Sequence, residues 1–195
     1  SRATMQRAQM QREVEAAEID LLELETTGRP ARKDLGAPLV NGRDLVSARL
    51  QLRLEQLRDE RVVAAWEAEQ LAGGVQDGRY HPFDLRVRQL DLERIERQIG
   101  AVRRMLQLRA RLLEGEIEEA EARDRKNLLE ARIEAELARM EVEIARARAE
   151  RLADSPGAAG LNRLGADYQL RMAEVQAEMA ELRLRVLREQ SDFEE

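Results

Sequence analysis

Apolar residues along most of this chain recur at alternating steps of three and four positions, which places them on one face of an α-helix. Three similar phrases begin at Gln51, Gln89 and Gln169, and the second and third each continue into such a stripe. The two stripes match position for position: Leu92, Ile95, Ile99, Val102 and Leu106 against Met172, Val175, Met179, Leu182 and Val186. A repeated template and a chance alignment of two heptad helices both explain the match. In either case each stripe predicts a seam for another helix.

Interruptions of the periodicity predict where the helices begin and end. A first helix runs from about Thr4 to Thr27, and Gly28 and Pro30 stop it. One side of this helix carries a stripe made of Met10, Val14, Ala17, Leu21 and Leu24. After a connection rich in turn residues, Asp44 is the predicted N-cap of a second helix over about 44–72, which Gly73 and Gly74 close.

A third helix is predicted to start at about residue 83, because Pro82 and Asp84 suit a first helical turn. No proline follows until residue 156, so the pattern allows one helix over 83–153, about 70 residues and roughly 105 Å long. Its seam is weak where Arg109 and Glu116 occupy core positions, and a break near Gly115 stays open. The segment Asp154 to Gly157 ends this helix, and a last helix covers about 162–190.

These elements predict an all-α fold, an elongated antiparallel bundle of coiled-coil hairpins. One long central helix is flanked by shorter helices stacked end to end, because short loops make successive helices antiparallel neighbours. The predicted domains are an N-terminal helix over 1–28, a linker over 29–43 and a hairpin domain over 44–192.

The second half of the long helix carries two adjacent apolar stripes, which implies neighbours on two sides. One stripe is rich in alanine and permits close approach of another backbone. We therefore predict a contact between copies of the chain at Ala131, Ala135, Ala138, Val142, Ala145 and Ala149. Trp66 is interpreted as either a core residue or an anchor of the same kind of interface.

Composition supports thin helical layers, since aromatic residues are 3% and charged residues 37% of the chain. The net charge is −6 and basic residues alternate with acidic ones, so no nucleic-acid partner is predicted. The longest purely apolar run, Val62 to Trp66, is far shorter than the about 20 residues of a membrane-spanning helix. The start at Ser1 without methionine indicates a removed signal peptide or a trimmed chain, and favours export to the periplasm or cell surface over the cytoplasm.

Residues suited to chemistry are few. The chain has no cysteine, and its only histidine, His81, precedes Pro82, where helix capping or surface packing is expected. The acidic run from Glu114 to Glu121 is interpreted as a solvated helix face paired with Arg123 and Arg125, with cation binding as the alternative. We predict no enzyme activity, no metal and no cofactor.

One long helix flanked by two shorter ones, with Leu- and Ala-rich seams over residues 44–192, resembles the helical region of TolC-type outer-membrane efflux channels. It is also similar to the helical hairpins of type I secretion membrane-fusion (periplasmic adaptor) proteins. The residues that carry the resemblance are Leu71 to Val75, then Phe83 to Leu85, and the phrases around Gln89 and Gln169. The resemblance implies envelope or export proteins as partners.

Two functions follow from the sequence. The first is a non-enzymatic structural subunit that self-associates through its long helices into a ring, tube or filament. The alternative, which rests on the resemblance, is a periplasmic adaptor or channel-like component of an export or efflux system.

Overall fold

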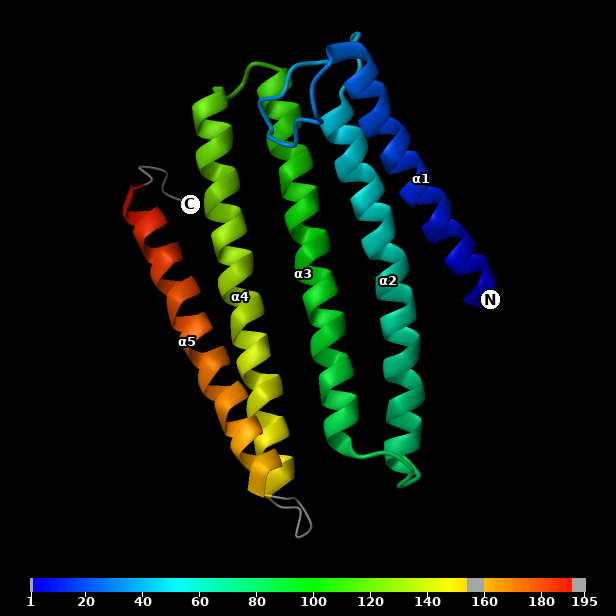
Figure 1. The fold of residues 1–195 in the computed structure, drawn as a ribbon, viewed down its shortest axis with the longest axis vertical. Helices are drawn as coiled ribbons and strands as arrows, with labels where there is room; N and C mark the ends of the chain where they lie inside the picture. The colour runs from blue at the N-terminus through cyan, green and yellow to red at the C-terminus, as the bar shows by residue number, and fades with distance from the viewer. Residues whose placement is uncertain (1, 154–159, 191–195) are drawn as a thin grey trace. The chain divides into compact units, whose positions relative to one another are not determined.

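The computed structural model describes residues 2–153 and 160–190. These residues form five α-helices and no β-strand: α1 (Arg2–Thr27), α2 (Leu45–Gln76), α3 (Pro82–Leu113), α4 (Glu119–Ala153) and α5 (Gly160–Gln190) (Figure 1). The predicted all-α class is confirmed. No helix in the described part of the chain is long and apolar enough to cross a membrane. The predicted helix end at Asp154 to Gly157 lies outside the described residues.

The chain divides into two compact units. The first contains residues 1–61 and 98–126, and the second contains residues 62–97 and 127–195. Helices α2, α3 and α4 each contribute residues to both units. Helix α1 belongs wholly to the first unit and α5 to the second.

The prediction of one helix over 83–153 is wrong, because the helix breaks at Gly115. Gly115 has a φ of 74°, in the left-handed region that costs glycine little. The N–H of Glu116 donates to the carbonyl of Arg111 (2.9 Å), and the N–H of Gly115 donates to that of Leu112 (3.2 Å). This pair of bonds is the Schellman motif that ends many helices. Helix α4 then starts afresh at Glu119.

After this break the chain runs back along itself. Within the second unit Arg86 of α3 pairs with Glu143 of α4 (2.7 Å), and Asp84 pairs with Arg151 (3.1 Å). Residue numbers rise along α3 while their partners fall along α4, so the two helices are antiparallel neighbours. The continuous long helix along which the shorter helices were predicted to stack is therefore replaced by α3 and α4.

The other helix boundaries follow the sequence more closely. Asp44 caps α2 as predicted, since its Oδ1 accepts from the N–H of Ser47 (3.3 Å). Helix α2 passes through Gly73 and Gly74, where it was predicted to close, and ends at Gln76, two residues before Gly78, whose φ is 72°. A Cβ on Gly74 would lie 2.1 Å from the ring of Tyr80, so this glycine serves close packing inside the helix.

Each unit has its own core. In the first unit Leu35, Ala37 and Val46 are buried together, with Leu50, Met105 and Leu108 packed against them. The connection between α1 and α2, predicted as a linker, therefore supplies core residues. In the second unit the buried cluster joins α4 to α5 and consists of Ala131, Ala135, Ala180 and Leu184.

The break at Gly115 predicts opposite effects for two glycine-to-alanine substitutions. Gly115→Ala should lower the free energy of unfolding by about 1–2 kcal/mol, because alanine is strained in the left-handed conformation. Gly100→Ala, inside α3 with open space around a built Cβ, should raise it by about 0.5–1 kcal/mol. Urea unfolding followed by circular dichroism measures both. Stabilisation by Gly115→Ala would show that α3 continues into α4.

Candidate interaction surfaces

The alanine-rich stripe of α4 faces the chain's own α5. Ala131 and Ala135 are each 1% exposed and pack with Ala180 and Leu184 of α5. Ala138 lies against the same cluster. The close helix contact predicted on this stripe exists, but within one chain.

The remaining residues of that predicted interface are only partly covered. Val142, Ala145 and Ala149 are half-buried. Ion pairs fasten α4 to α5 nearby, from Arg139 to Glu181 (2.7 Å) and from Arg183 to Glu134 (2.9 Å). Helix α4 thus has neighbours on two sides, α3 and α5, as its two stripes predicted, and both neighbours come from the same chain.

Trp66 lies on α2 and is 59% exposed, so it is not a core residue. Val62, one helical turn earlier on the same side, is also exposed. A role for Trp66 as an interface anchor stays a prediction.

An exposed apolar stripe lies on α5, and we call it the α5 stripe. Met179 is 66% exposed, although its counterpart Ile99 in α3 is buried. The exposed members of the α5 stripe are Tyr168, Met172, Met179, Leu182 and Val186. The face of α5 that packs on α4 is different and uses Ala177, Ala180 and Leu184, which are buried. The same heptad pattern is therefore covered in α3 and open in α5.

Helix α1 also exposes the stripe that the sequence marked as a seam, which we call the α1 stripe. Its exposed large members are Met10, Val14, Leu21 and Leu24. The opposite side of α1 meets α2 through charged residues, with Arg12 paired to Asp59 and Arg49 paired to Asp20 (2.7 Å). The apolar side of α1 is thus left without a neighbour in the described part of its unit.

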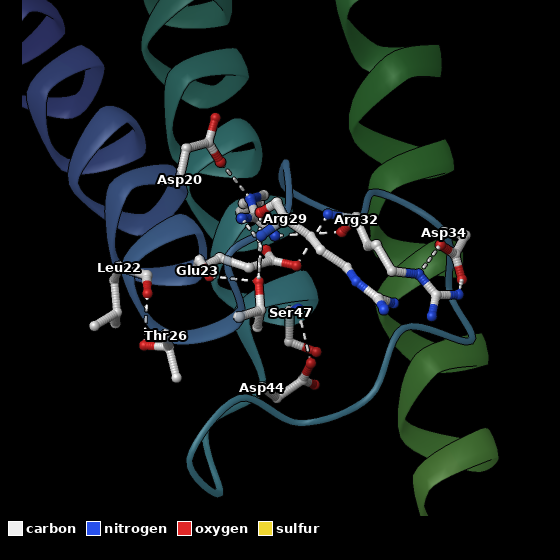
Figure 2. Close-up of polar contacts among 11 residues, drawn as sticks. Asp20, Leu22, Glu23, Thr26, Arg29, Arg32, Asp34, Asp44 and Ser47 are labelled. Atoms are coloured by element: carbon white, nitrogen blue, oxygen red, sulfur yellow. Dashed lines mark hydrogen bonds and ion pairs between the residues drawn. The ribbon is translucent and has the colours of Figure 1, made fainter.

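A polar network holds the end of α1 to the connection that follows it (Figure 2). The buried carboxylate of Glu23 accepts from the backbone N–H of Arg32 (3.0 Å) and from the guanidinium of Arg49. Burial alone raises the pKa of Glu23, but these hydrogen bonds outweigh it, and the net pKa lies below the ordinary value of a glutamate. The network therefore requires an ionised Glu23.

The most buried charge in the described residues is Arg109 of α3, whose exposed fraction is 2%. Its Nε and Nη2 donate to Oδ1 of Asp44 at 3.1 and 2.9 Å, and its Nη1 donates to the carbonyl of Leu35. One guanidinium thus joins α3, the connection after α1 and the N-terminus of α2. In the sequence, the only sign of this contact was that an arginine occupies a core position.

The same contact sets the charge of Asp44. Burial raises the pKa of its carboxyl, whereas hydrogen bonds from Arg109 and Ser47 lower it. The lowering is the larger effect, so the net pKa lies below the ordinary value of an aspartate. Asp44 therefore combines two roles, as the N-cap of α2 and as the partner of a buried cation.

The residues with candidate chemistry have structural contacts. Nδ1 of His81 accepts from the N–H of Phe83 (3.1 Å), so His81 caps α3, one of its two expected roles. Part of the acidic run forms the loop before α4, and Glu121 pairs with Arg125 (2.7 Å) as predicted, whereas Arg123 lies near Asp124. Among the described residues no group of three acidic, histidine or cysteine side chains is placed to hold a metal ion.

No protein-family model, curated protein or solved structure matches this chain.

The depressed pKa of Asp44 predicts a pH-dependent contribution to stability. Asp44→Asn should lower the free energy of unfolding at pH 7 by about 1–3 kcal/mol, because it weakens charge-assisted hydrogen bonds. The wild-type advantage is complete above the unfolded-state pKa, about 4, and is lost as the pH falls through the lower folded-state value. Urea unfolding between pH 7 and pH 3 measures this difference.

Asp77→Asn is the matched control, because Asp77 pairs with Arg79 in an exposed position. It should change stability by less than about 1 kcal/mol. A deficit of Asp44→Asn that stays constant down to pH 3 would contradict an ionised Asp44 in the folded protein.

Proposed function

We propose that this protein is a non-enzymatic structural subunit that self-associates through its helices into a ring, tube or filament. The observation that carries the proposal is the α5 stripe, whose members Tyr168, Met179 and Leu182 are more than half exposed. Contiguous exposed apolar side chains on a helix are typical of surfaces that bind another protein.

The spacing of the α5 stripe supports another helix as the partner. Met172, Val175, Met179, Leu182 and Val186 follow one another at steps of three and four. Such a row accepts the side chains of a facing helix in the packing of a coiled coil. An open groove of ≈500 Å³ lies along it, lined by Asn127, Met179, Leu182, Arg183, Val186 and Leu187.

This surface replaces the one predicted from the sequence. Helix α5 of the same chain covers Ala131 and Ala135, and Ala138 packs beside them. An arginine at Ala138 would therefore enter the seam between α4 and α5 and destabilise the folded chain itself. The α5 stripe is exposed, so charges placed there test association without entering the core.

The proposal predicts that wild-type protein forms oligomers whose mass rises with concentration. Met179→Glu combined with Leu182→Glu should reduce the mass to that of one chain while leaving the helical circular dichroism unchanged, because both side chains are exposed. Light scattering after size-exclusion chromatography measures the mass. Leu39→Glu is the matched control, since Leu39 is exposed in a loop outside the stripes, and should leave the mass unchanged.

Wild-type protein that remains one chain in mass at high concentration would overturn the proposed function. An equal loss of mass in Leu39→Glu would show that added negative charge alone disperses the protein.

A further inference from the structure

The α1 stripe and the α5 stripe have the same geometry. Met10, Val14, Ala17, Leu21 and Leu24 follow steps of four and three, as the α5 stripe does. In each case the stripe lies on the side of the helix away from its packed face. On α1 that face includes the buried Glu23, and on α5 it includes the buried Ala177 and Leu184. Each stripe therefore offers one open coiled-coil surface.

The charges beside the two stripes are opposite in sign. The positions that border a coiled-coil seam carry four acids and no base on α1, namely Glu13, Glu18, Asp20 and Glu25. The corresponding positions on α5 carry three arginines and one acid, namely Arg171, Arg183, Arg185 and Glu178. Charges at these positions select the partner of a coiled-coil helix.

The exposure of these charges fits such a role. Glu13, Glu18 and Glu25 are exposed on α1, as are Arg171 and Arg185 on α5. Asp20 is held by Arg49 of α2, Arg183 by Glu134 of α4 and Arg171 by Glu174 of its own helix, so these three charges are already partly balanced.

A groove between α1 and α2 is also lined by acidic residues. It measures ≈430 Å³, and its apolar lining includes Ile19, Leu22 and Leu52. Three glutamates, Glu15, Glu18 and Glu55, line it as well. The groove beside the α5 stripe has Arg183 as its charged residue.

We infer that the α1 stripe of one copy packs against the α5 stripe of a second copy. The inference rests on the proposed self-association and names the two surfaces that meet. Pairing α1 with α1 would set acids against acids, and pairing α5 with α5 would set arginines against arginines. Because the two surfaces differ, each added copy leaves one of each kind open, and the contact generates a ring or a filament.

The test uses two variants that each lack one surface. Val14→Glu with Leu21→Glu removes the α1 stripe, and Met179→Glu with Leu182→Glu removes the α5 stripe. Each variant alone should have the mass of one chain, and an equimolar mixture should form a 1:1 dimer. Sedimentation velocity measures the masses, and circular dichroism checks that both variants remain helical.

A charge exchange gives a second readout with smaller substitutions. Glu18→Arg with Glu25→Arg, and separately Arg171→Glu with Arg185→Glu, should each weaken association about tenfold or more. Mixing these two variants should restore association between them, because the signs are opposite again.

The outcomes separate the two proposals. Wild-type protein that never associates overturns the proposed function and this inference with it. Wild-type protein that associates, together with surface-deleted variants that fail to form a mixed dimer or that dimerise alone, overturns only the pairing of α1 with α5.

Discussion

The antiparallel course of α3 and α4 depends on the reversal at Gly115. A left-handed residue there ends α3 with its last carbonyls satisfied and allows α4 to return along α3. On another side of α4, α5 covers Ala131 and Ala135 of the alanine-rich stripe through Ala180 and Leu184. Met179 and Leu182 lie on another side of α5 and remain exposed.

The first unit is organised differently, around buried charge. Arg109 reaches Asp44 and the carbonyl of Leu35, so the core cluster at Leu35 and Val46 closes around a guanidinium. Removing the charge of one partner weakens the hydrogen bonds of the other, which typically costs about 1–3 kcal/mol. The geometry of the connection after α1 is thus specified by polar contacts, in contrast to the apolar seam between α4 and α5.

Features that depend on neighbouring residues in the sequence were predictable. The N-cap at Asp44 was predicted and is confirmed, and capping was one of the two roles expected of His81; both depend on contacts within three residues of the cap. The break at Gly115 was not decided by the sequence, because good helix formers flank it and helical periodicity continues on both sides. The free energy gained when α4 packs against α3 favours a reversal over a continuous helix, and this gain comes from tertiary contacts.

The spacing of apolar residues likewise could not predict which helix covers each apolar stripe. The pattern at Ala131 and Ala135 showed that a close neighbour was needed, but could not show that α5 of the same chain would supply it. Arg109 illustrates the converse case. On a core position it looked like a weakness in the seam, whereas its partner, Asp44, lies 65 residues away in the sequence.

The exposed stripes limit the free energy that a contact between them can provide. A fully buried large apolar side chain contributes about 1.5–3 kcal/mol, and the side chains of the α5 stripe are already partly covered, so each gains less. Association itself costs about 4–15 kcal/mol, which is similar to what the two stripes, with about five partly exposed residues each, can supply together. Apolar burial alone therefore leaves such a contact close to balance. Under that condition the sign of the charges bordering each stripe, acidic on α1 and mostly basic on α5, is sufficient to decide which helices stay together.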